Sequence, residues 1–392
     1  MAAKQKSDYF GEKKPLGIYI HIPFCNSKCN YCAFCSKVGT PEEKTTYCRD
    51  LLAEIKLRAA EYSADFVVAS IYIGGGTPST FENYEIRDIL HCIYKYFRVK
   101  NDAEITIEVN PNSVTRTKLR EYVLAGVNRF SVGLQTTNNN LLAAMGRTHK
   151  VEDFNNIIND MRTQGINNIS ADLIIGYPGQ TIKDVEDSVK HLISLKIPHI
   201  SCYMLQVEDK TKLKDLVDHR LVSVPEEGIV VSMYNKVVEL LRAAGYNRYE
   251  ISNFALPAFK SVHNSSYWSG RDYLGFGVAA HSLVNNIRFN NSNSLAKYHQ
   301  SITELNCSPV ENAKQRTIDE QKEEMIMLAL RTNNGLDTKA YEAKFGENLL
   351  VKKKAALTNL ITNGFLTLDK LGTLKVTDKG ALVLNRIIYE LI

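Results

Sequence analysis

Residues 17–32 read Gly17-Ile-Tyr-Ile-His-Ile-Pro-Phe-Cys25-Asn-Ser-Lys-Cys29-Asn-Tyr-Cys32, an apolar run followed by three closely spaced cysteines. The run has the apolar, β-branched composition of a buried strand. The cysteines lie on a loop too short to surround a metal completely, so one coordination site stays open. A cubane iron–sulfur cluster usually has four thiolate ligands. Three cysteines therefore expose one iron to another ligand, such as an amino-acid amine and carboxylate.

Two alternative roles for these cysteines stay open. Structural zinc usually takes two separated pairs of ligands around a closed tetrahedron, and no second pair follows this loop. Cys35 is either a fourth ligand, which would close the open iron, or a bystander on an exposed loop, and we expect a bystander. The remaining cysteines stand singly, as small buried hydrophobes usually do: Cys48, Cys92, Cys202 and Cys307.

Outward from this loop, apolar β-rich runs alternate with helix-length segments six times. Parallel strands with right-handed crossovers curl into a partial barrel, and functional groups then collect at the carboxyl ends of the strands. The apolar character of the runs favours strands buried on both faces. We therefore predict an α/β fold with a partial (β/α)6 barrel. Its expected strands are residues 16–24, 66–73, 104–109, 129–134, 169–175 and 200–205.

The chain is expected to divide into three parts, because 392 residues exceed what one compact core usually organises. Residues 1–215 hold the barrel, and residues 216–310 form an extension rich in Asn, Tyr and Ser. Residues 311–392 form a separate small domain. In that domain helical stretches precede a strand pair at 365–368 and 374–376 and a last helix, the order of elements in a winged helix.

Composition excludes several classes of protein. The chain is 44% apolar and 23% charged, as ordinary globular proteins are. Its formal charge of +5 is spread along the sequence, and the lysine triplet at 352–354 is more typical of a solvated helix end than of a basic stripe. No apolar run is long enough to span a bilayer, and the first 15 residues lack the apolar core of a signal peptide. We expect a cytoplasmic protein with no nucleic-acid partner and no transmembrane segment.

Residue types suited to a zwitterionic ligand follow the expected strands. Gly74-Gly-Gly-Thr-Pro78 comes directly after the second strand, where consecutive glycines let backbone groups approach a ligand that a side chain would obstruct. Arginine and carboxylates supply charge-assisted hydrogen bonds, as Glu108, Arg147 and Asp172 can. Taken singly, each of these features is also typical of a tight turn or a solvated charge. Their order along the chain favours one shared site.

These segments resemble the coproporphyrinogen-oxidase-like branch of the radical S-adenosylmethionine (SAM) superfamily. Residues 17–34 are similar to its cluster segment, and residues 72–78 to its SAM-methionine motif. The resemblance implies that Cys25, Cys29 and Cys32 hold a [4Fe–4S] cluster, against which Tyr19 lies. It also implies a SAM site lined by Tyr19, Gly74, Gly75, Gly76, Thr77, Glu108, Gln135, Arg147 and Asp172.

Three features favour the HemW-type haem chaperones of this branch over its oxidases, which decarboxylate two propionates of coproporphyrinogen by 5′-deoxyadenosyl radical chemistry. The oxidases place a fourth cysteine two residues after the third, where this chain has Phe34. They carry a long N-terminal extension, whereas here the first strand is expected by residue 16. The segment His263-Asn-Ser-Ser-Tyr-Trp268 resembles the chaperones' HNxxYW signature.

The resemblance implies a protein that binds haem and delivers it to acceptor haemoproteins such as respiratory-chain enzymes. A histidine beside a tyrosine and the only tryptophan offers an iron ligand next to flat apolar surfaces. We expect a haem site at His263, Tyr267 and Trp268, with His281 as second choice of ligand. The alternative for His263 is a hydrogen-bonded histidine that supports a turn.

Two other functions stay open: an oxygen-independent coproporphyrinogen III oxidase and a regulatory nucleic-acid binder. The sequence does not settle whether SAM is cleaved, so no catalytic residue is assigned.

Overall fold

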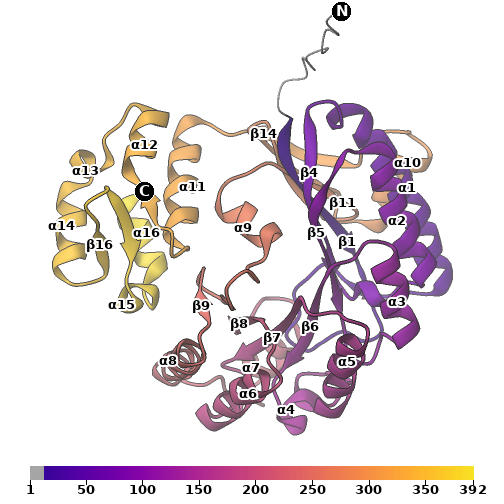
Figure 1. Ribbon diagram of the computed structural model, residues 1–392, viewed down its shortest axis with the longest axis horizontal. Coiled ribbons are helices and arrows are strands. Elements are labelled where there is room, and N and C mark those ends of the chain that lie inside the picture. Colours follow the sequence, from indigo (N-terminus) through magenta and orange to yellow (C-terminus); the bar gives the residue numbers. More distant parts are fainter. Residues whose placement is uncertain (1–12) are drawn as a thin grey trace, which may run out of the picture.

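The computed structural model describes residues 13–392 of the chain. A partial barrel of parallel strands carries helices on its outer face, and a small domain lies beside it (Figure 1). This arrangement confirms the predicted α/β class with a partial barrel and a C-terminal domain. None of the helices within residues 13–392 combines the length and the apolar character needed to cross a bilayer.

The predicted barrel strands are confirmed, although β5 begins at Val99 rather than at residue 104. They pair in parallel and in chain order: β1 (Lys14–Ile22), β4 (Phe66–Gly75), β5 (Val99–Val109), β6 (Arg129–Gln135), β7 (Ile169–Ile175) and β8 (His199–Met204). Helices join consecutive strands and cover the outside of the barrel: α1 (Pro41–Tyr62), α2 (Asn83–Tyr96), α3 (Arg116–Leu124), α4 (Asn139–Ala144), α5 (Val151–Thr163) and α6 (Ile182–Ser194).

Helix α1 shows how local sequence sets these elements. Its N-cap, Thr40, accepts a hydrogen bond from the backbone of Glu43, whose side chain accepts one from Thr40 in return. This capping box satisfies amide groups that the first turn would leave unpaired. Proline suits the first helical position, which Pro41 occupies. Leu51 and Ile55 then face the barrel and are fully buried.

The barrel strands are buried on both faces, as expected, but only the face under the helices is consistently apolar. Side chains alternate between the two faces of a strand. On β5, Ile105 and Ile107 belong to the hydrophobic core beneath the helices. Glu104, Thr106 and Glu108 lie on the opposite face, towards the barrel interior. The interior is therefore polar, as a site for a charged ligand requires.

The expected extension does not merely pack on the barrel but adds strands to its sheet, which has twelve strands within residues 13–392. The sequence did not reveal these strands because they are too short to show a period. At one edge β10 (Asn253–Ala255) joins β8, and β9 (Asn247–Arg248) follows it. At the other edge β11 (Tyr273–Phe276) pairs in parallel with β1, followed by β12 (His281–Val284), β13 (Ile287–Asn291) and β14 (Val310–Gln315). The helices of this part are α7 (Lys212–Asp218), α8 (Glu227–Ala243), α9 (Val262–Trp268) and α10 (Leu295–Thr303).

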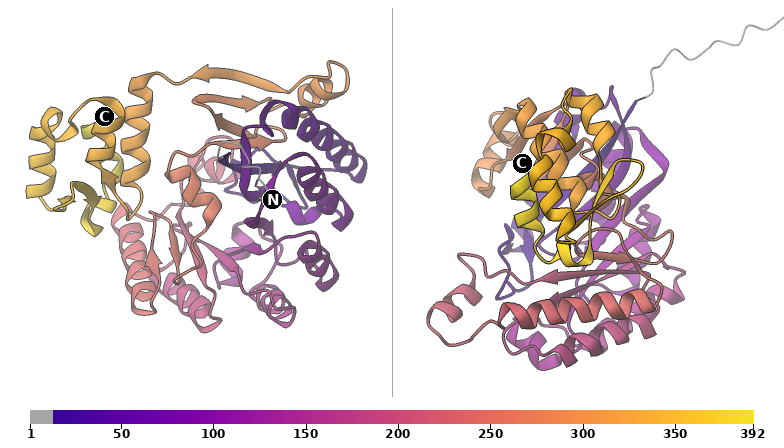
Figure 2. Two further views of the ribbon diagram at one scale, coloured as in Figure 1. Left: turned by 45° about the horizontal axis from the view of Figure 1, so that its top comes forward. Right: turned by 90° about the vertical axis from the view of Figure 1, so that its left-hand side faces the viewer.

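The C-terminal domain follows β14 and has its own hydrophobic core (Figure 2). The predicted strand pair, β16 (Leu366–Leu368) and β17 (Thr373–Val376), gains a third strand, β15 (Leu336–Asp337), so that the sheet order is β15-β17-β16. Ion pairs from Arg242 and Arg248 to Asp378 link the domain to α8 and β9. Its elements are α11 (Ile318–Leu330), β15 (Leu336–Asp337), α12 (Thr338–Phe345), α13 (Leu349–Lys352), α14 (Lys354–Thr362), β16 (Leu366–Leu368), β17 (Thr373–Val376), α15 (Asp378–Ala381) and α16 (Leu384–Leu391).

Candidate functional site

The predicted cluster ligands lie on the loop after β1. Two short strands, β2 (Phe24–Cys25) and β3 (Lys37–Val38), pair and hold the ends of this loop together. Cys25, Cys29 and Cys32 are free, half-buried thiols. In residues 13–392 no three His, Cys, Asp or Glu side chains converge as the ligands of one metal ion would. The thiolates of a cubane cluster bind different irons, so they do not need to meet at one point.

Two of the three thiols have polar partners. The Thr77 hydroxyl donates to Cys25 Sγ at 3.6 Å, and Arg147 Nη1 donates to Cys29 Sγ at 3.5 Å. Burial raises the pKa of the Cys25 and Cys32 thiols. A thiolate here therefore needs a nearby positive charge, which Arg147 supplies from the protein side.

Cys35 is engaged by different neighbours. Its sulfur donates to the backbone oxygen of Asn293 at 3.9 Å, and its own backbone oxygen lies 2.9 Å from His21 Nε2. The side chain of the preceding residue, Phe34, is 69% exposed and therefore points away from the buried part of the loop. These contacts support the expected role of Cys35 as a bystander, which stays a prediction.

The glycine-rich turn after β4 packs so closely that side chains would collide. A Cβ on Gly74 would lie 2.8 Å from the Tyr72 ring and 3.0 Å from the Glu108 carboxyl. Gly75 has a φ of +113°, which side-chain-bearing residues rarely adopt. A Cβ on Gly76 would lie 2.7 Å from the backbone oxygen of Phe24 at the base of the cysteine loop. The turn therefore brings β4 against both the cysteine loop and Glu108.

Glu108 is held by the turn and by a tyrosine ladder. Its carboxylate accepts hydrogen bonds from the Tyr72 hydroxyl at 2.7 Å and the Gly75 amide at 3.2 Å. The Tyr72 ring stacks on Tyr19, with 6.3 Å between ring centroids, and the Tyr19 hydroxyl lies 3.0 Å from His21 Nδ1. Burial raises the pKa of Glu108 to about 7, although both hydrogen bonds oppose this shift. The carboxylate can therefore change its charge near neutral pH.

The remaining predicted SAM residues are Gln135 at the end of β6, Asp172 in the middle of β7 and Arg147 in the connection after α4. Arg147 Nη2 donates to the Gly133 backbone oxygen at 3.0 Å, where β6 bulges and Gln135 adopts a φ of +70°. Such backbone strain in a non-glycine residue often marks a functional position. Ser131 on β6 donates to Asp172 on β7 at 3.4 Å, and burial raises the pKa of Asp172. Both strands thus point polar groups into the barrel.

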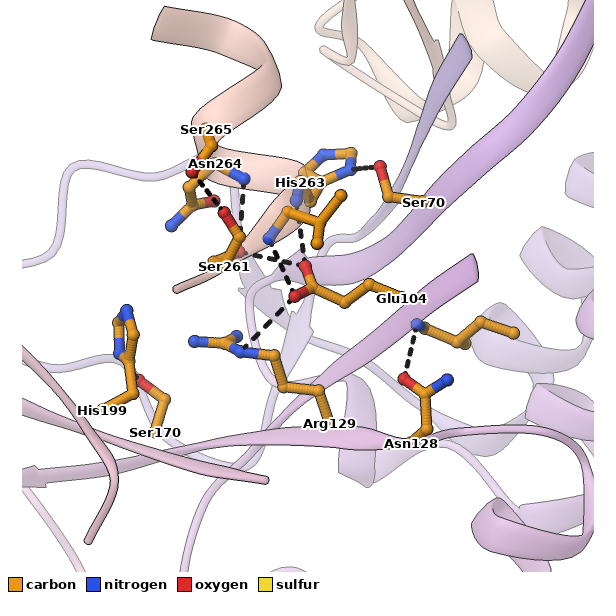
Figure 3. A network of polar contacts seen from close by, with 12 residues as sticks. Ser70, Glu104, Asn128, Arg129, Ser170, His199, Ser261, His263, Asn264 and Ser265 are labelled. Carbon is orange, nitrogen blue, oxygen red and sulfur yellow. Dashed lines mark hydrogen bonds and ion pairs between the residues drawn. The ribbon is translucent and has the colours of Figure 1, made fainter. Parts of the chain in front are cut away.

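The predicted haem residues lie on α9, which enters the barrel interior (Figure 3). The Glu104 carboxylate accepts hydrogen bonds from the backbone amides of Val262 and His263, at 2.8 and 2.9 Å, and from the Ser261 hydroxyl at 3.0 Å. Arg129 Nε lies 4.0 Å from the same carboxylate. A carboxylate suits the positive end of a helix. The HNxxYW segment is therefore anchored on a buried ion pair.

His263 is fully buried, and both of its ring nitrogens have protein partners. Nδ1 lies 2.9 Å from Ser70 Oγ, and Nε2 lies 2.9 Å from the Tyr267 hydroxyl. Burial lowers the pKa of His263 to about 3, so the imidazole is neutral at physiological pH. Iron could bind here only after one of these hydrogen bonds broke. Ligation of haem by His263 stays a prediction, and the geometry agrees better with the alternative of a hydrogen-bonded histidine.

The other expected haem residues differ in position. The Tyr267 ring packs edge-on against Tyr273 of β11, at 4.6 Å between centroids. Trp268 is half-buried at the end of α9. His281, the second choice of ligand, is exposed at the start of β12 and lines a cleft next to the C-terminal domain.

Sequence reasoning assigned no role to Tyr72, Glu104 or Arg129. The Tyr72 ring contacts both Tyr19 of β1 and His263 of α9, since it also stacks on the His263 ring with 5.3 Å between the centroids. The signal that identifies these residues is a polar side chain at every second strand position, as in the Glu104–Glu108 and Arg129–Ser131 segments. Apolar residues stand between these polar positions, so in the sequence each strand looks like a continuous apolar run.

Comparison with known proteins defines the class. Residues 19–192 match the model of the Radical SAM superfamily, and residues 317–383 match that of the HemN C-terminal domain. The fold is similar to that of coproporphyrinogen III oxidase (HemN) from Escherichia coli, a radical SAM enzyme, with a TM-score of 0.84 over 97% of this chain and 90% of that one. The two sequences are 24% identical, so this likeness establishes the fold alone. The chain is a radical SAM protein with a HemN-type C-terminal domain.

Sequence relatives define the family within this class. Heme chaperone HemW of Lactococcus lactis is 33% identical over 94% of this chain and 95% of its own, and HemW of Bacillus subtilis is 33% identical over 94% and 97%. The mitochondrial radical SAM domain-containing protein 1 of Danio rerio is 29% identical over 95% of this chain and 85% of its own. The chain belongs to the HemW family of radical SAM proteins.

The residues present fit the [4Fe–4S] cluster and SAM that this superfamily implies. Within residues 13–392, buried polar atoms without a hydrogen-bond partner include Arg147 Nε, Asn110 Oδ1 and Thr106 Oγ1. Such atoms are rare in folded proteins and commonly mark a place for a ligand or water. Arg147 also touches the cysteine loop, so a donor suited to a carboxylate lies beside the expected open iron.

We expect SAM to bind the cluster-loaded protein more tightly as the pH rises from about 6 to about 8. The pKa of Glu108 is raised to about 7, so its ionised fraction grows about tenfold across this range and favours the cationic groups of SAM. Equilibrium dialysis measures the affinity. The amine of SAM also titrates, so Glu108→Gln serves as the reference: it should bind more weakly and lose this part of the pH dependence. An identical pH profile in Glu108→Gln would contradict a role for this carboxylate.

Proposed function

We propose that this protein is a haem chaperone, which binds haem and delivers it to acceptor haemoproteins such as respiratory-chain enzymes. The observation that carries the proposal is the likeness to HemW proteins across 94% of the chain. The acceptors and a cytoplasmic location stay predictions.

The residues assigned here have separate tasks. Cys25, Cys29 and Cys32 would hold the [4Fe–4S] cluster, which supplies an electron to SAM when both are bound. Tyr72 and Gly75 orient the Glu108 carboxylate through two hydrogen bonds. The remaining SAM residues would be Tyr19, Gly74, Gly76, Thr77, Gln135, Arg147 and Asp172.

Two observations support the binding of a charged ligand in the barrel interior. Arg147 keeps a positive charge next to Cys29 and next to the strained end of β6. The Glu108 carboxyl on β5 and the Asp172 carboxyl on β7 lie on either side of β6 and face the barrel interior, where burial raises the pKa of both. A cationic ligand would stabilise their ionised forms.

We expect the cluster-loaded protein to bind about one haem per chain and to pass it to an acceptor, without converting coproporphyrinogen III to protoporphyrinogen. Phe34 stands where the resemblance to the oxidases requires a fourth cysteine, and its side chain is largely exposed. Haem titration and transfer to an apo-haemoprotein can be followed by the Soret band. The matching assay is anaerobic incubation with SAM, reductant and coproporphyrinogen III.

Two results would overturn the proposal. Formation of protoporphyrinogen in proportion to time and protein would establish the oxidase. Absence of a saturable Soret change in the wild-type protein would remove the haem function itself.

A further inference from the structure

The imidazole of His263 packs against the tyrosine that orients Glu108. The His263 and Tyr72 rings stack with an angle of 27° between their planes and 5.3 Å between their centroids. The Tyr72 ring also stacks on Tyr19, and its hydroxyl donates a hydrogen bond to Glu108 at 2.7 Å. A chain of direct contacts therefore leads from α9, which carries the HNxxYW segment, to the expected SAM site.

His263 cannot ligate haem iron in the position where it packs. Its side chain is fully buried, and a Cβ added to Gly17 of β1 would lie only 3.4 Å from its Cε1 atom. Ser70 Oγ holds its Nδ1 atom (Figure 3), and the Tyr267 hydroxyl holds its Nε2 atom. A porphyrin ring cannot reach nitrogens that two strands and α9 enclose. Ligation therefore requires the imidazole to leave this position.

We propose that His263 positions Tyr72, and through it Glu108, so that SAM binding and ligation of haem iron by this histidine oppose each other. The proposal rests on the haem-chaperone function and describes how its two ligands are coupled. The packed imidazole supports the SAM site, whereas an imidazole bound to iron leaves Tyr72 without this stacking partner. A ligand that favours one of two states weakens a ligand that favours the other. SAM binding would thus help to release haem to an acceptor.

The contact between Tyr72 and Glu108 gives the coupling its own signature. The hydrogen bond from Tyr72 lowers the pKa of Glu108, against the larger effect of burial. Loss of this bond would raise that pKa further, so the carboxylate would ionise, and SAM would bind, only at higher pH. The titratable and charged groups that face Glu108 come from β1, β4, β6, β7 and β8: Tyr19, Tyr72, Arg129, Asp172 and Tyr203.

Equilibrium dialysis of SAM against the haem-free, cluster-loaded protein tests the positioning role. His263→Ala removes the ring and should bind SAM about two- to tenfold more weakly, the usual contribution of an aromatic pair, with its pH profile shifted upwards. His263→Phe loses the same two hydrogen bonds but keeps a ring, so its SAM affinity should stay close to that of the wild type. Wild-type affinity and pH profile in His263→Ala, or equal losses in both variants, would contradict positioning by the ring.

Haemin titration of the wild-type protein, with and without saturating SAM, tests the opposition between the ligands. The Soret band reports haemin binding and dialysis reports SAM binding, and linkage requires each ligand to weaken the other by the same factor. Tyr72→Phe keeps the stack but removes the hydrogen bond to Glu108, so this factor should fall towards one. Independent binding in the wild type would overturn the proposal. A factor that persists in Tyr72→Phe would also overturn it, because the two ligands would then overlap directly.

Ser70→Ala tests the coupling without changing the histidine. It removes the partner of His263 Nδ1 and should tighten haemin binding about two- to tenfold, because one hydrogen bond fewer holds the imidazole in place. Ser170→Ala is the matched control, since Ser170 Oγ lies 2.7 Å from Nδ1 of another fully buried histidine, His199. This control should bind haemin as the wild type does.

Unchanged or weaker haemin binding in Ser70→Ala would overturn the coupling while leaving the chaperone function in place. Failure of the wild-type protein to bind haemin saturably would instead overturn the function.

Discussion

Replacing Cys25, Cys29 or Cys32 with Ala should abolish the iron–sulfur cluster, whereas Cys35→Ala should retain about four irons per chain. All four cysteines lie on the segment whose ends are joined by β2 and β3, but only Cys25 and Cys29 receive hydrogen bonds from Thr77 and Arg147. Cys35 instead donates to a backbone oxygen outside the loop. Iron and sulfide analysis after anaerobic reconstitution, with the spectrum of the reduced cluster, measures the outcome.

A matched control is Cys307→Ala, which removes an exposed cysteine far along the chain and should have no effect. Loss of the cluster in Cys35→Ala would mean that all four cysteines ligate iron, which would close the site needed by SAM. Zinc in place of iron in the purified protein would contradict the open-cluster assignment as well.

Glu104→Ala should destabilise the protein by about 3–5 kcal/mol, the usual cost of leaving one partner of a buried ion pair alone. Three hydrogen bonds from the start of α9 end on this carboxylate, and Arg129 beside it is only 2% exposed. The substitution would leave the arginine charge and two helix amides without their acceptor (Figure 3).

Trp268 makes the effect measurable, because the only tryptophan of the chain lies at the end of α9. Denaturant unfolding followed by its fluorescence reports on this helix, while circular dichroism reports on the whole chain. Glu104→Gln keeps the shape and one acceptor oxygen, so it should cost less than Glu104→Ala. Equal midpoints for Glu104→Ala and the wild type would show that α9 does not depend on this anchor. Because the barrel and the C-terminal domain have separate hydrophobic cores, the transitions seen by the two probes are compared with each other and are not combined into one free energy of unfolding.

Local sequence determined the elements of the barrel and the identity of its cofactor loop. The strand positions follow from apolar runs, and the start of α1 from the capping box of Thr40 and Glu43, since both depend on neighbours in the chain. The cysteine spacing and the glycine turn are likewise local signals. Glu108, Arg147 and Asp172 could be proposed because each follows or lies on a recognisable strand.

Tertiary structure alone decided how these residues meet. The short strands β11 to β14 carry too little pattern to be recognised, and they acquire their place only by pairing with the exposed edge of β1. Glu104 and Arg129 are ordinary charged residues in sequence, and they become the anchor of α9 because the barrel brings residues 157 to 159 positions apart into contact. His263 and His281 both look like ligands in the sequence. Packing buries the first between Ser70 and Tyr267 and leaves the second open at a domain boundary, because a histidine's availability depends on which groups surround its nitrogens.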